Sequence, residues 1–305
     1  METPRYFIDL HHIDSGVLQR ILEVAKELKA ARRQGGRPKL LEGRTLAMIF
    51  EKNSTRTRVS FEVAMLELGG NVLSFSSGEL QLGRGETVAD TARVLSRYVD
   101  AIMLRCHAHR TLEELAGAAA IPVINGLTNG CHPCQIMADL MTFEEKRGPA
   151  AGKTFAWVGD GNNMANTFIA AAGQFGLTLR LACPPQLAPS QGMIKWARER
   201  GATVTLTENP VRAVAGADAV ITDTWVSMGD RDTETRYELL APYQVNAALM
   251  AQAGKDALFM HCLPAHRGEE VTAEVIDGPQ SAVWDEAENR LHVQKAILLW
   301  CLHAL

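Results

Sequence analysis

The sequence lacks an excess of charge of either sign. Its 305 residues include 31 lysines and arginines and 35 aspartates and glutamates, which gives a formal net charge of −4. A chain with this balance has no broad positive field to hold nucleic acid or an anionic membrane surface. We therefore expect neither partner, and any anion must be held by a local group of side chains.

Long hydrophobic runs are also missing. Stretches such as Ala118–Ile121 are far shorter than the roughly 20 residues needed to span a bilayer. The opening residues, Met1-Glu2-Thr3-Pro4, have neither the basic start nor the apolar centre of a secretion signal. We expect a cytoplasmic protein, and its 47% hydrophobic and 22% charged residues are typical of ordinary globular domains.

Cysteines are few and irregularly spaced. The six lie at positions 106, 131, 134, 183, 262 and 301, which form no disulfide framework in a chain of this length, so we expect reduced thiols. At roughly 100–200 residues per domain, the length predicts two domains with a sizeable core.

What the sequence does contain is an alternation of short apolar runs and helical patterns, which is typical of an α/β fold. In the first half we predict strands at Thr45–Phe50, Val72–Phe75, Ala101–Leu104 and Pro122–Ile124, and helices near Arg56–Leu68, Val88–Tyr98 and Leu112–Ala119. In the second half we predict strands at Thr154–Val158, Thr178–Leu181, Thr203–Leu206, Ala219–Thr222 and Ala257–Met260, and helices near Asn163–Gln174, Gln191–Glu199 and Asn246–Ala251. The apolar runs indicate buried parallel strands, and therefore two open parallel sheets.

A polar stretch at 144–153, with Gly148-Pro149 inside it, interrupts this alternation. It predicts a boundary between a first domain at 1–147 and a second at 148–285. No strand follows the last apolar-periodic segment, so we expect the C-terminal helix, at 286–305, to pack back across the domains.

Ligands of open α/β sheets bind beyond the carboxyl ends of the strands, where this chain is unusually polar. After the first strand comes Ser54-Thr55-Arg56-Thr57-Arg58, a predicted helix start with two arginines. Helix starts prefer acids, so arginines here gain from a bound anion on which N–H groups, hydroxyls and a guanidinium can converge. A solvated basic helix start is the alternative interpretation.

Further strand ends add donors. Arg105 follows the third predicted strand, and Cys131-His132-Pro133-Cys134-Gln135 opens a later helix. On that helix His132 and Gln135 would point along one face, toward whatever the arginines hold. Together these hydrogen-bond donors favour a bound anion.

The turn Gly159-Asp160-Gly161-Asn162-Asn163 resembles a dinucleotide-binding turn. However, Met164 stands where the third glycine should be, and Leu181-Ala182-Cys183, at the end of the next strand, has no acid to bind a ribose. We therefore reject NAD. The two asparagines instead offer amide groups suited to the carboxylate and amine of a zwitterion.

The last two polar strand ends are Asp223-Thr224-Trp225-Val226-Ser227-Met228-Gly229 and His261-Cys262-Leu263-Pro264. An aspartate there can hold a cationic amine, while Ser227 and the Met228 backbone can hold the rest of a small amino acid. A loop with a capping aspartate is the alternative.

Together these blocks resemble the carbamoyltransferases of the aspartate and ornithine type, in the same order and over nearly the whole chain. The resemblance rests on Ser54-Thr55-Arg56-Thr57-Arg58, Asp90-Thr91-Ala92-Arg93-Val94-Leu95, His132-Pro133-Cys134-Gln135, Asp160-Gly161-Asn162-Asn163 and the two blocks just described, which resemble the ornithine-specific members. It implies two α/β domains joined by two helices. It also implies carbamoyl transfer from carbamoyl phosphate to the side-chain amine of L-ornithine, giving L-citrulline for arginine biosynthesis, with no metal and no organic cofactor.

The same resemblance implies roles for single residues. Carbamoyl phosphate would be bound by Ser54, Thr55, Arg56, Thr57, Arg105, His132, Gln135, Cys262, Leu263 and Arg290, with Gln81 reaching into the neighbouring site of a homotrimer. L-Ornithine would be bound by Asn163, Asp223, Ser227 and Met228. The catalytic residues would be Arg105, His132, Asp223 and Cys262.

Other interpretations stay open at this point. Cys131-His132-Pro133-Cys134 is a C-x-x-C at a helix start and could perform thiol–disulfide exchange. Cys106-His107-Ala108-His109, or His261-Cys262 with His266, could bind a metal, although neither has the paired spacing of a structural zinc site. A catalytically silent homologue, or an enzyme for acetylated ornithine, putrescine or aspartate, is the remaining alternative.

Overall fold

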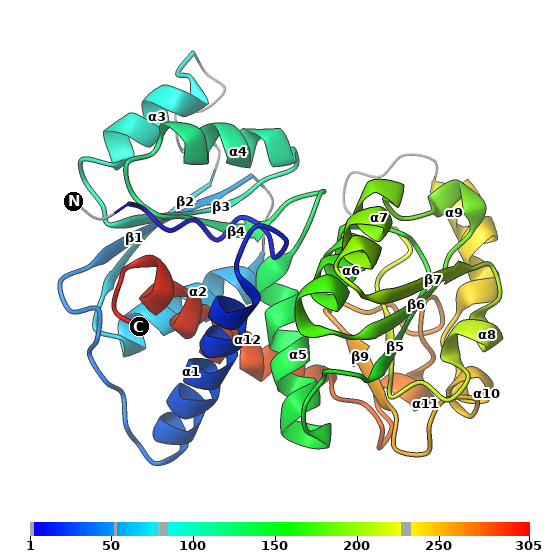
Figure 1. Cartoon of the computed structure of the whole chain (residues 1–305). Helices are drawn as coiled ribbons and strands as arrows, with labels where there is room; N and C mark the ends of the chain where they lie inside the picture. Colours follow the sequence, from blue (N-terminus) through cyan, green and yellow to red (C-terminus); the bar gives the residue numbers. More distant parts are fainter. Residues whose placement is uncertain (1–2, 52–53, 77, 80–84, 227–232) are drawn as a thin grey trace. The chain divides into compact units, whose positions relative to one another are not determined.

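The computed structural model describes residues 3–51, 54–76, 78–79, 85–226 and 233–305. The chain forms two compact units, of which the first comprises Met1–Ala138 and Asn289–Leu305 and the second Asp139–Glu288. The chain passes between the units inside α5 (Pro133–Arg147) and again inside α12 (Val283–Cys301) (Figure 1). Each unit is described below by itself.

The first unit is built on a parallel sheet of four strands in the order β2-β1-β3-β4. The strands are β1 (Thr45–Phe50), β2 (Asn71–Ser76), β3 (Ala101–Arg105) and β4 (Val123–Leu127). Helices α3 (Val88–Leu95) and α4 (His109–Ala118) cover one face of the sheet, and α1 (Ser15–Arg33) and α2 (Thr55–Glu67) cover the other (Figure 1).

Alternating side chains of these strands supply the core of the first unit. Ala47 and Ile49 of β1 pack in one cluster with Leu95 of α3 and Leu112 of α4. The strand residues between them are also buried, because helices cover both faces of the sheet. Every strand of this sheet is parallel, so all four carboxyl ends lie along one edge.

The second unit contains a parallel sheet of five strands in the order β7-β6-β5-β8-β9. The strands are β5 (Thr154–Val158), β6 (Thr178–Ala182), β7 (Thr203–Thr207), β8 (Ala219–Thr222) and β9 (Leu258–His261). The helices are α6 (Asn163–Phe175), α7 (Gln191–Glu199), α8 (Pro210–Val214), α9 (Thr233–Leu240), α10 (Ala247–Met250) and α11 (Ala273–Ile276).

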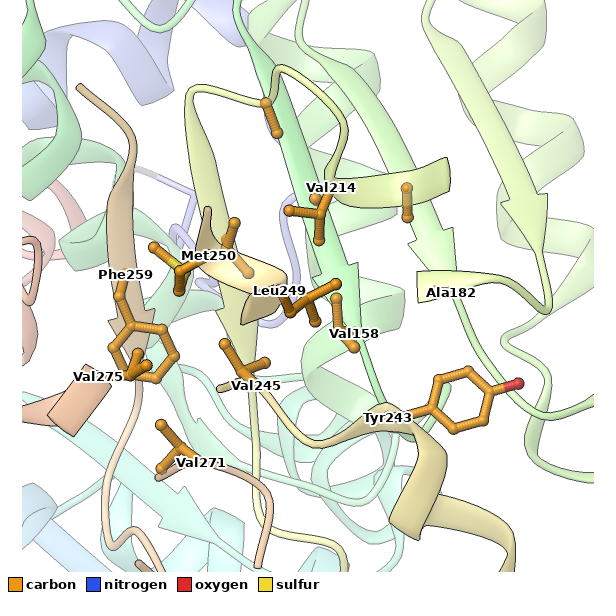
Figure 2. Close-up of a cluster of buried hydrophobic side chains, with 14 of the residues drawn as sticks. Val158, Ala182, Val214, Tyr243, Val245, Leu249, Met250, Phe259, Val271 and Val275 are labelled. Carbon is orange, nitrogen blue, oxygen red and sulfur yellow. The ribbon is translucent and has the colours of Figure 1, made fainter. Parts of the chain in front are cut away.

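The core of the second unit has two sides. On one side Val158 and Phe259 pack with Val214 of α8 and Leu249 of α10, as Figure 2 shows. On the other side the β5 residues Phe155 and Trp157 contact Phe168 of α6, with ring centroids 6.4 and 6.0 Å apart. The two-residue period of β5 therefore divides its side chains between two helical layers.

The predicted fold class is confirmed: both units are α/β with wholly parallel sheets. The expectation missed the α-helices α1, α8, α9 and α11, and it ended β4 at Ile124, although that strand continues to Leu127. Within the described part of the chain, no helix combines the length and the apolarity that crossing a membrane requires.

Candidate active site

The first unit brings two arginines onto one buried hydroxyl. Thr57, in the first turn of α2, is fully buried, and its Oγ1 accepts hydrogen bonds from Arg105 Nη1 at 3.0 Å and from Arg290 Nη2 at 2.7 Å. Arg290 Nη1 also donates to Gln135 Oε1 at 2.9 Å. Residues from α2, β3, α5 and α12 therefore meet at one point.

Local sequence explains how two of these groups are placed. Ser54 caps α2, its Oγ accepting from the Thr57 N–H at 3.2 Å, and so fixes the helix start directly after β1. Arg105 lies where the β3–β4 register shifts, an irregularity that re-aims a strand side chain. Opposite it stands Gly126, where a Cβ would collide with Met103 Sδ and come within 3.3 Å of Arg105 Cβ. A side chain at this position would have to displace Met103 beside the register shift.

His132 lies at the start of α5 and is 3% exposed. Burial, followed by the positive charges of Arg290, Arg105 and Arg56, holds the pKa of this imidazole well below its ordinary value. The ring is therefore neutral at physiological pH and can donate one hydrogen bond without adding charge.

The charge pattern of this cluster favours a bound anion. Guanidinium groups repel one another, and the charges of Arg290, Arg105 and Arg56 all act on His132. Helix α2 adds the N–H groups of its first turn, next to the Thr57 hydroxyl. A phosphate would neutralise the arginines and accept from both kinds of donor.

The second unit places its polar groups at the carboxyl ends of β5, β8 and β9. Asp223, just after β8, accepts at Oδ2 from Asn162 Nδ2 at 2.9 Å and at Oδ1 from the Cys262 thiol at 3.1 Å. Burial, followed by the charge of Asp223, raises the pKa of the Cys262 thiol well above its ordinary value. Cys262 is therefore a protonated donor to Asp223 and not a thiolate nucleophile.

Asn162 performs two tasks with one amide. Its Oδ1 caps α6 by accepting from the N–H groups of Met164 and Ala165 at 2.9 and 3.2 Å, while its Nδ2 holds Asp223. The sequence analysis assigned the substrate contact to Asn163 and gave Asn162 no separate role. The asparagine directly before a helix is an N-cap signal that could have revealed it.

A second contact missed by the sequence analysis joins the β5 and β8 loops. Arg236 of α9 forms an ion pair with Asp160, and its Nε donates to the Trp225 carbonyl at 2.9 Å. The Trp225 and Tyr237 rings then meet edge to face, 5.9 Å apart. Since Arg236 follows the site loop by several residues, no local pattern indicates this contact.

His261 fixes the loop after β9. Its Nδ1 accepts from the Leu263 N–H at 2.9 Å and its Nε2 lies 3.1 Å from Glu270 Oε1, so Nε2 carries the proton. Leu263 has a φ of 57°, in the left-handed region that leucine seldom adopts. Strain of this kind is typical of functional loops.

The C-x-x-C hypothesis does not agree with the thiol environments. Burial raises the pKa of Cys134 to about 12, and that of Cys131 rises even further for the same main reason. Reactive cysteines have lowered pKa values instead. Cys106, from one of the candidate metal clusters, donates its thiol to the Ala108 carbonyl at 3.3 Å.

Comparison with known proteins supplies the family. Residues 5–145 match the model of the aspartate/ornithine carbamoyltransferase carbamoyl-P binding domain, and residues 151–301 match that of the Asp/Orn binding domain. The chain belongs to the aspartate/ornithine carbamoyltransferase family. This confirms the resemblance drawn from the sequence motifs.

Individual members of this carbamoyltransferase family are similar over their full length. Ornithine carbamoyltransferase of Rhodopseudomonas palustris is 59% identical, with 99% of this chain and 98% of that protein covered. The structure of ornithine carbamoyltransferase from Pyrococcus furiosus superposes with a TM-score of 0.94 at 51% identity, covering 97% of this chain and 96% of that one. An anabolic ornithine carbamoyltransferase from Campylobacter jejuni gives 0.92 at 40% identity, covering 97% and 98%.

Most of the carbamoyltransferase residues expected from the sequence fall into three groups. Thr57, Arg105, Gln135 and Arg290 are joined by hydrogen bonds, and the charge of Arg56 reaches His132 beside them. Asp223 and Cys262 are joined in the second unit. Gln81, Ser227 and Met228 lie outside the described residues.

Proposed function

We propose that the chain transfers the carbamoyl group of carbamoyl phosphate to the side-chain amine of L-ornithine, producing L-citrulline and phosphate for arginine biosynthesis. The convergence of Arg105 and Arg290 on Thr57 Oγ1 carries this proposal, because two guanidinium groups at one point suit an anion, and they lie in the domain whose family description is carbamoyl-P binding. We further propose that residues 1–147 with 286–305 bind carbamoyl phosphate and residues 148–285 bind ornithine.

One part of the anion site would bind the phosphate and another part would bind the carbamoyl group. The hydroxyls and N–H groups of Ser54, Thr55 and Thr57, with the Arg56 guanidinium, would hold the phosphate. A second set of groups would surround the carbamoyl group: Arg105, His132, Gln135, Arg290, Cys262 and Leu263. Neutral His132 can donate to the carbamoyl oxygen as negative charge grows there. Loss of one such donor typically costs about 2.7–4 kcal/mol of transition-state stabilisation.

Asp223 is the group that we propose to orient the ornithine amine, with Asn163, Ser227 and Met228 holding the rest of the amino acid. An alkyl ammonium of ordinary pKa, about 10.4, must lose a proton before it can attack. The free amine then forms a C–N bond to the carbamoyl carbon, the C–O bond to phosphate breaks, and the amine's second proton leaves to phosphate or solvent. Phosphate is a good leaving group when a cation beside it stabilises its charge. The reaction therefore needs no covalent enzyme intermediate, metal or organic cofactor.

We also propose that the active form is a cytoplasmic homotrimer in which Gln81 reaches the neighbouring site. Four side chains of the first unit support an interface, since Leu40, Val59, Leu66 and Leu73 are each 46 to 59% exposed. Val59 and Leu66 belong to α2, and Leu73 belongs to the edge strand β2. Apolar surface beside an open strand edge favours subunit contact. Sedimentation of the purified protein should give the mass of a trimer, and a monomer with full activity would contradict this.

A citrulline assay with four acceptors tests the activity. Purified protein should form a ureido product from carbamoyl phosphate and L-ornithine, and far less from acetylated ornithine, putrescine or aspartate. Product from putrescine alone would overturn the substrate assignment. No product from any amine, despite phosphate binding, would favour the silent homologue.

A further inference from the structure

A group of metal-ligating side chains lies in the turn that follows the β9 loop, at positions to which the proposed reaction assigns no role. His266, Glu269 and Glu270 each offer one ligand atom, and these atoms all lie within 4.8 Å of one another. His266 Nδ1 is 3.7 Å from Glu269 Oε2 and 3.7 Å from Glu270 Oε2. Two ligand atoms of a tetrahedral zinc ion, each roughly 2.1 Å from the metal, are about 3.4 Å apart. The spacing of the group is therefore close to that of a zinc site.

One oxygen of this group is buried and lacks a hydrogen-bond donor. The Glu270 side chain is fully buried, and its Oε1 accepts from the His266 N–H at 2.6 Å and lies 3.1 Å from His261 Nε2. Within the described part of the chain, Glu270 Oε2 makes no hydrogen bond. It faces His266 Nδ1 across a distance too long for one. A buried acceptor of this kind is costly, and a bound cation would satisfy it.

The charges around the turn also favour a divalent cation. The Arg267 guanidinium, which could have neutralised the glutamates, is held by Asp277 through Nε and Nη2 at 2.9 and 2.7 Å. Among the described residues, the ion pairs of Glu269 and Glu270 are all with histidines. Burial raises the pKa of Glu270, but hydrogen bonds from a histidine ring and a backbone N–H outweigh it and hold that pKa below its ordinary value. Two carboxylates are thus available to neutralise one ion.

Both carboxylates are oriented by groups behind them. The Tyr237 hydroxyl donates to Glu269 Oε2 at 2.8 Å, and the His261 ring fixes Glu270 Oε1. The Glu269 N–H donates to the His266 carbonyl at 3.0 Å and closes the turn. Outer partners like these hold the ligands of protein metal sites in place. His266 is 48% exposed, so an ion can enter from solvent and keep a water ligand.

The neighbouring group of Asp223, His261 and Cys262 is a poorer metal site, although its ligand atoms are also close together. Both ring nitrogens of His261 are engaged, one by the Leu263 N–H and one by Glu270. The Cys262 thiol donates to Asp223. An ion there would have to displace these hydrogen bonds, whereas Glu270 Oε2 has none to lose.

We propose that His266, Glu269 and Glu270 bind a divalent transition-metal ion such as Zn²⁺, with water in the fourth position. One imidazole nitrogen and two carboxylate oxygens suit Zn²⁺ or Co²⁺, whereas Mg²⁺ and Ca²⁺ prefer oxygen ligands alone. The ion takes no part in the proposed carbamoyl transfer. It would stiffen the β9 loop, because Glu270 contacts His261, and His261 in turn accepts the Leu263 N–H.

Calorimetric titration of the metal-free, full-length protein with Zn²⁺ tests the site. Wild type should bind Zn²⁺ with micromolar or tighter affinity and should not bind Mg²⁺. His266→Ala removes the imidazole ligand, so affinity should fall more than about 100-fold, beyond the loss typical of an outer partner. Glu269→Gln keeps an acceptor for Tyr237 but should also bind weakly. The matched control is Glu274→Gln, an exposed acid of α11 outside the group, which should bind as wild type does.

Absence of micromolar Zn²⁺ binding in wild type, or equal affinity in wild type and His266→Ala, would show that the group is an ion pair only and would refute the site. Co²⁺ provides a second measurement, because a thiolate ligand gives cobalt a charge-transfer band. That band, or loss of binding in Cys262→Ser, would place the ion at the neighbouring group and contradict the proposal. These titrations use neither substrate, so they test the metal site whether or not citrulline is formed.

Discussion

Replacing Arg56 with alanine should move fold stability and anion affinity in opposite directions. Arg56 lies in the first turn of α2, is exposed, and adds its charge to those that lower the pKa of His132. A cation near a helix N-terminus is unfavourable by about 0.3–1 kcal/mol. Arg56→Ala should therefore raise the free energy of unfolding of the ligand-free protein by up to about 1 kcal/mol.

Binding should respond with the larger and opposite change. A hydrogen bond to a charged group contributes about 1.5–3 kcal/mol, so the affinity for phosphate and for carbamoyl phosphate should fall about 10- to 150-fold in Arg56→Ala. Isothermal calorimetry measures this, and urea unfolding without ligand measures the stability gain.

Arg58→Ala is the matched control, because Arg58 lies on the same helix but pairs with Glu62 at 3.1 Å. Its loss should cost about 0.5 kcal/mol of stability or less and leave anion affinity unchanged. Unchanged affinity in Arg56→Ala, or an equal loss in Arg58→Ala, would refute the assignment of Arg56 to the phosphate.

Three further substitutions address other parts of the site. Because the pKa of His132 is held well below 6.5, the unfolded chain binds a proton at this ring that the folded chain does not. Wild type should thus lose more stability than His132→Asn when urea unfolding is repeated at pH 5.5 instead of 7.5, and equal losses would contradict the buried neutral ring. Gly161→Ala places a Cβ within 2.6 Å of backbone atoms of residues 187–189, so it should lower the free energy of unfolding by about 1–3 kcal/mol, measured by thermal unfolding. Its control is Gly192→Ala, on the open side of α7, which should be neutral or stabilising. Cys134→Ser can still donate to the Asn125 carbonyl, so citrulline formation should persist, and its abolition would revive the thiol hypothesis.

Most of the sheet strands could be predicted from the sequence because they are short apolar runs buried on both faces, whereas the edge strands β2 and β7 are partly exposed. β1, β5 and β8 begin and end at the predicted residues. β4 was ended too early because Asn125 and Gly126 are typical loop residues. Asn125 is nevertheless buried, since its side chain donates to the Ile8 carbonyl at 2.8 Å. A tertiary contact there overrides the local preference.

Helix α1 was missed although its signal is present. Leu18, Ile21, Leu22, Ala25 and Leu28 are buried at helical spacing. In addition, Asp14 caps the helix by accepting from the Gly16 N–H at 2.9 Å. The polar residues between them lower the mean hydropathy of the segment, and this conceals the helical spacing of the apolar residues.

The candidate site could be predicted in part, for a physical reason. Motif residues at strand ends meet because parallel strands bring their carboxyl ends together, as Thr57 and Arg105 show. Arg236, which forms an ion pair with Asp160, lies far from it along the chain. Their pairing depends on which helix faces which loop, and hydropathy carries no information on that.

The Asn162 side chain caps α6 with its amide oxygen and donates to Asp223 with its amide nitrogen. This double role has an evolutionary consequence. An aspartate at this position would still cap α6, but it would set a second carboxylate against Asp223; serine or threonine would cap the helix and offer no nitrogen to Asp223. Selection for a new acceptor amine can therefore change this position only by unravelling the start of a helix or by releasing the neighbouring acid. We therefore expect divergence of substrate preference to begin at other positions of the site.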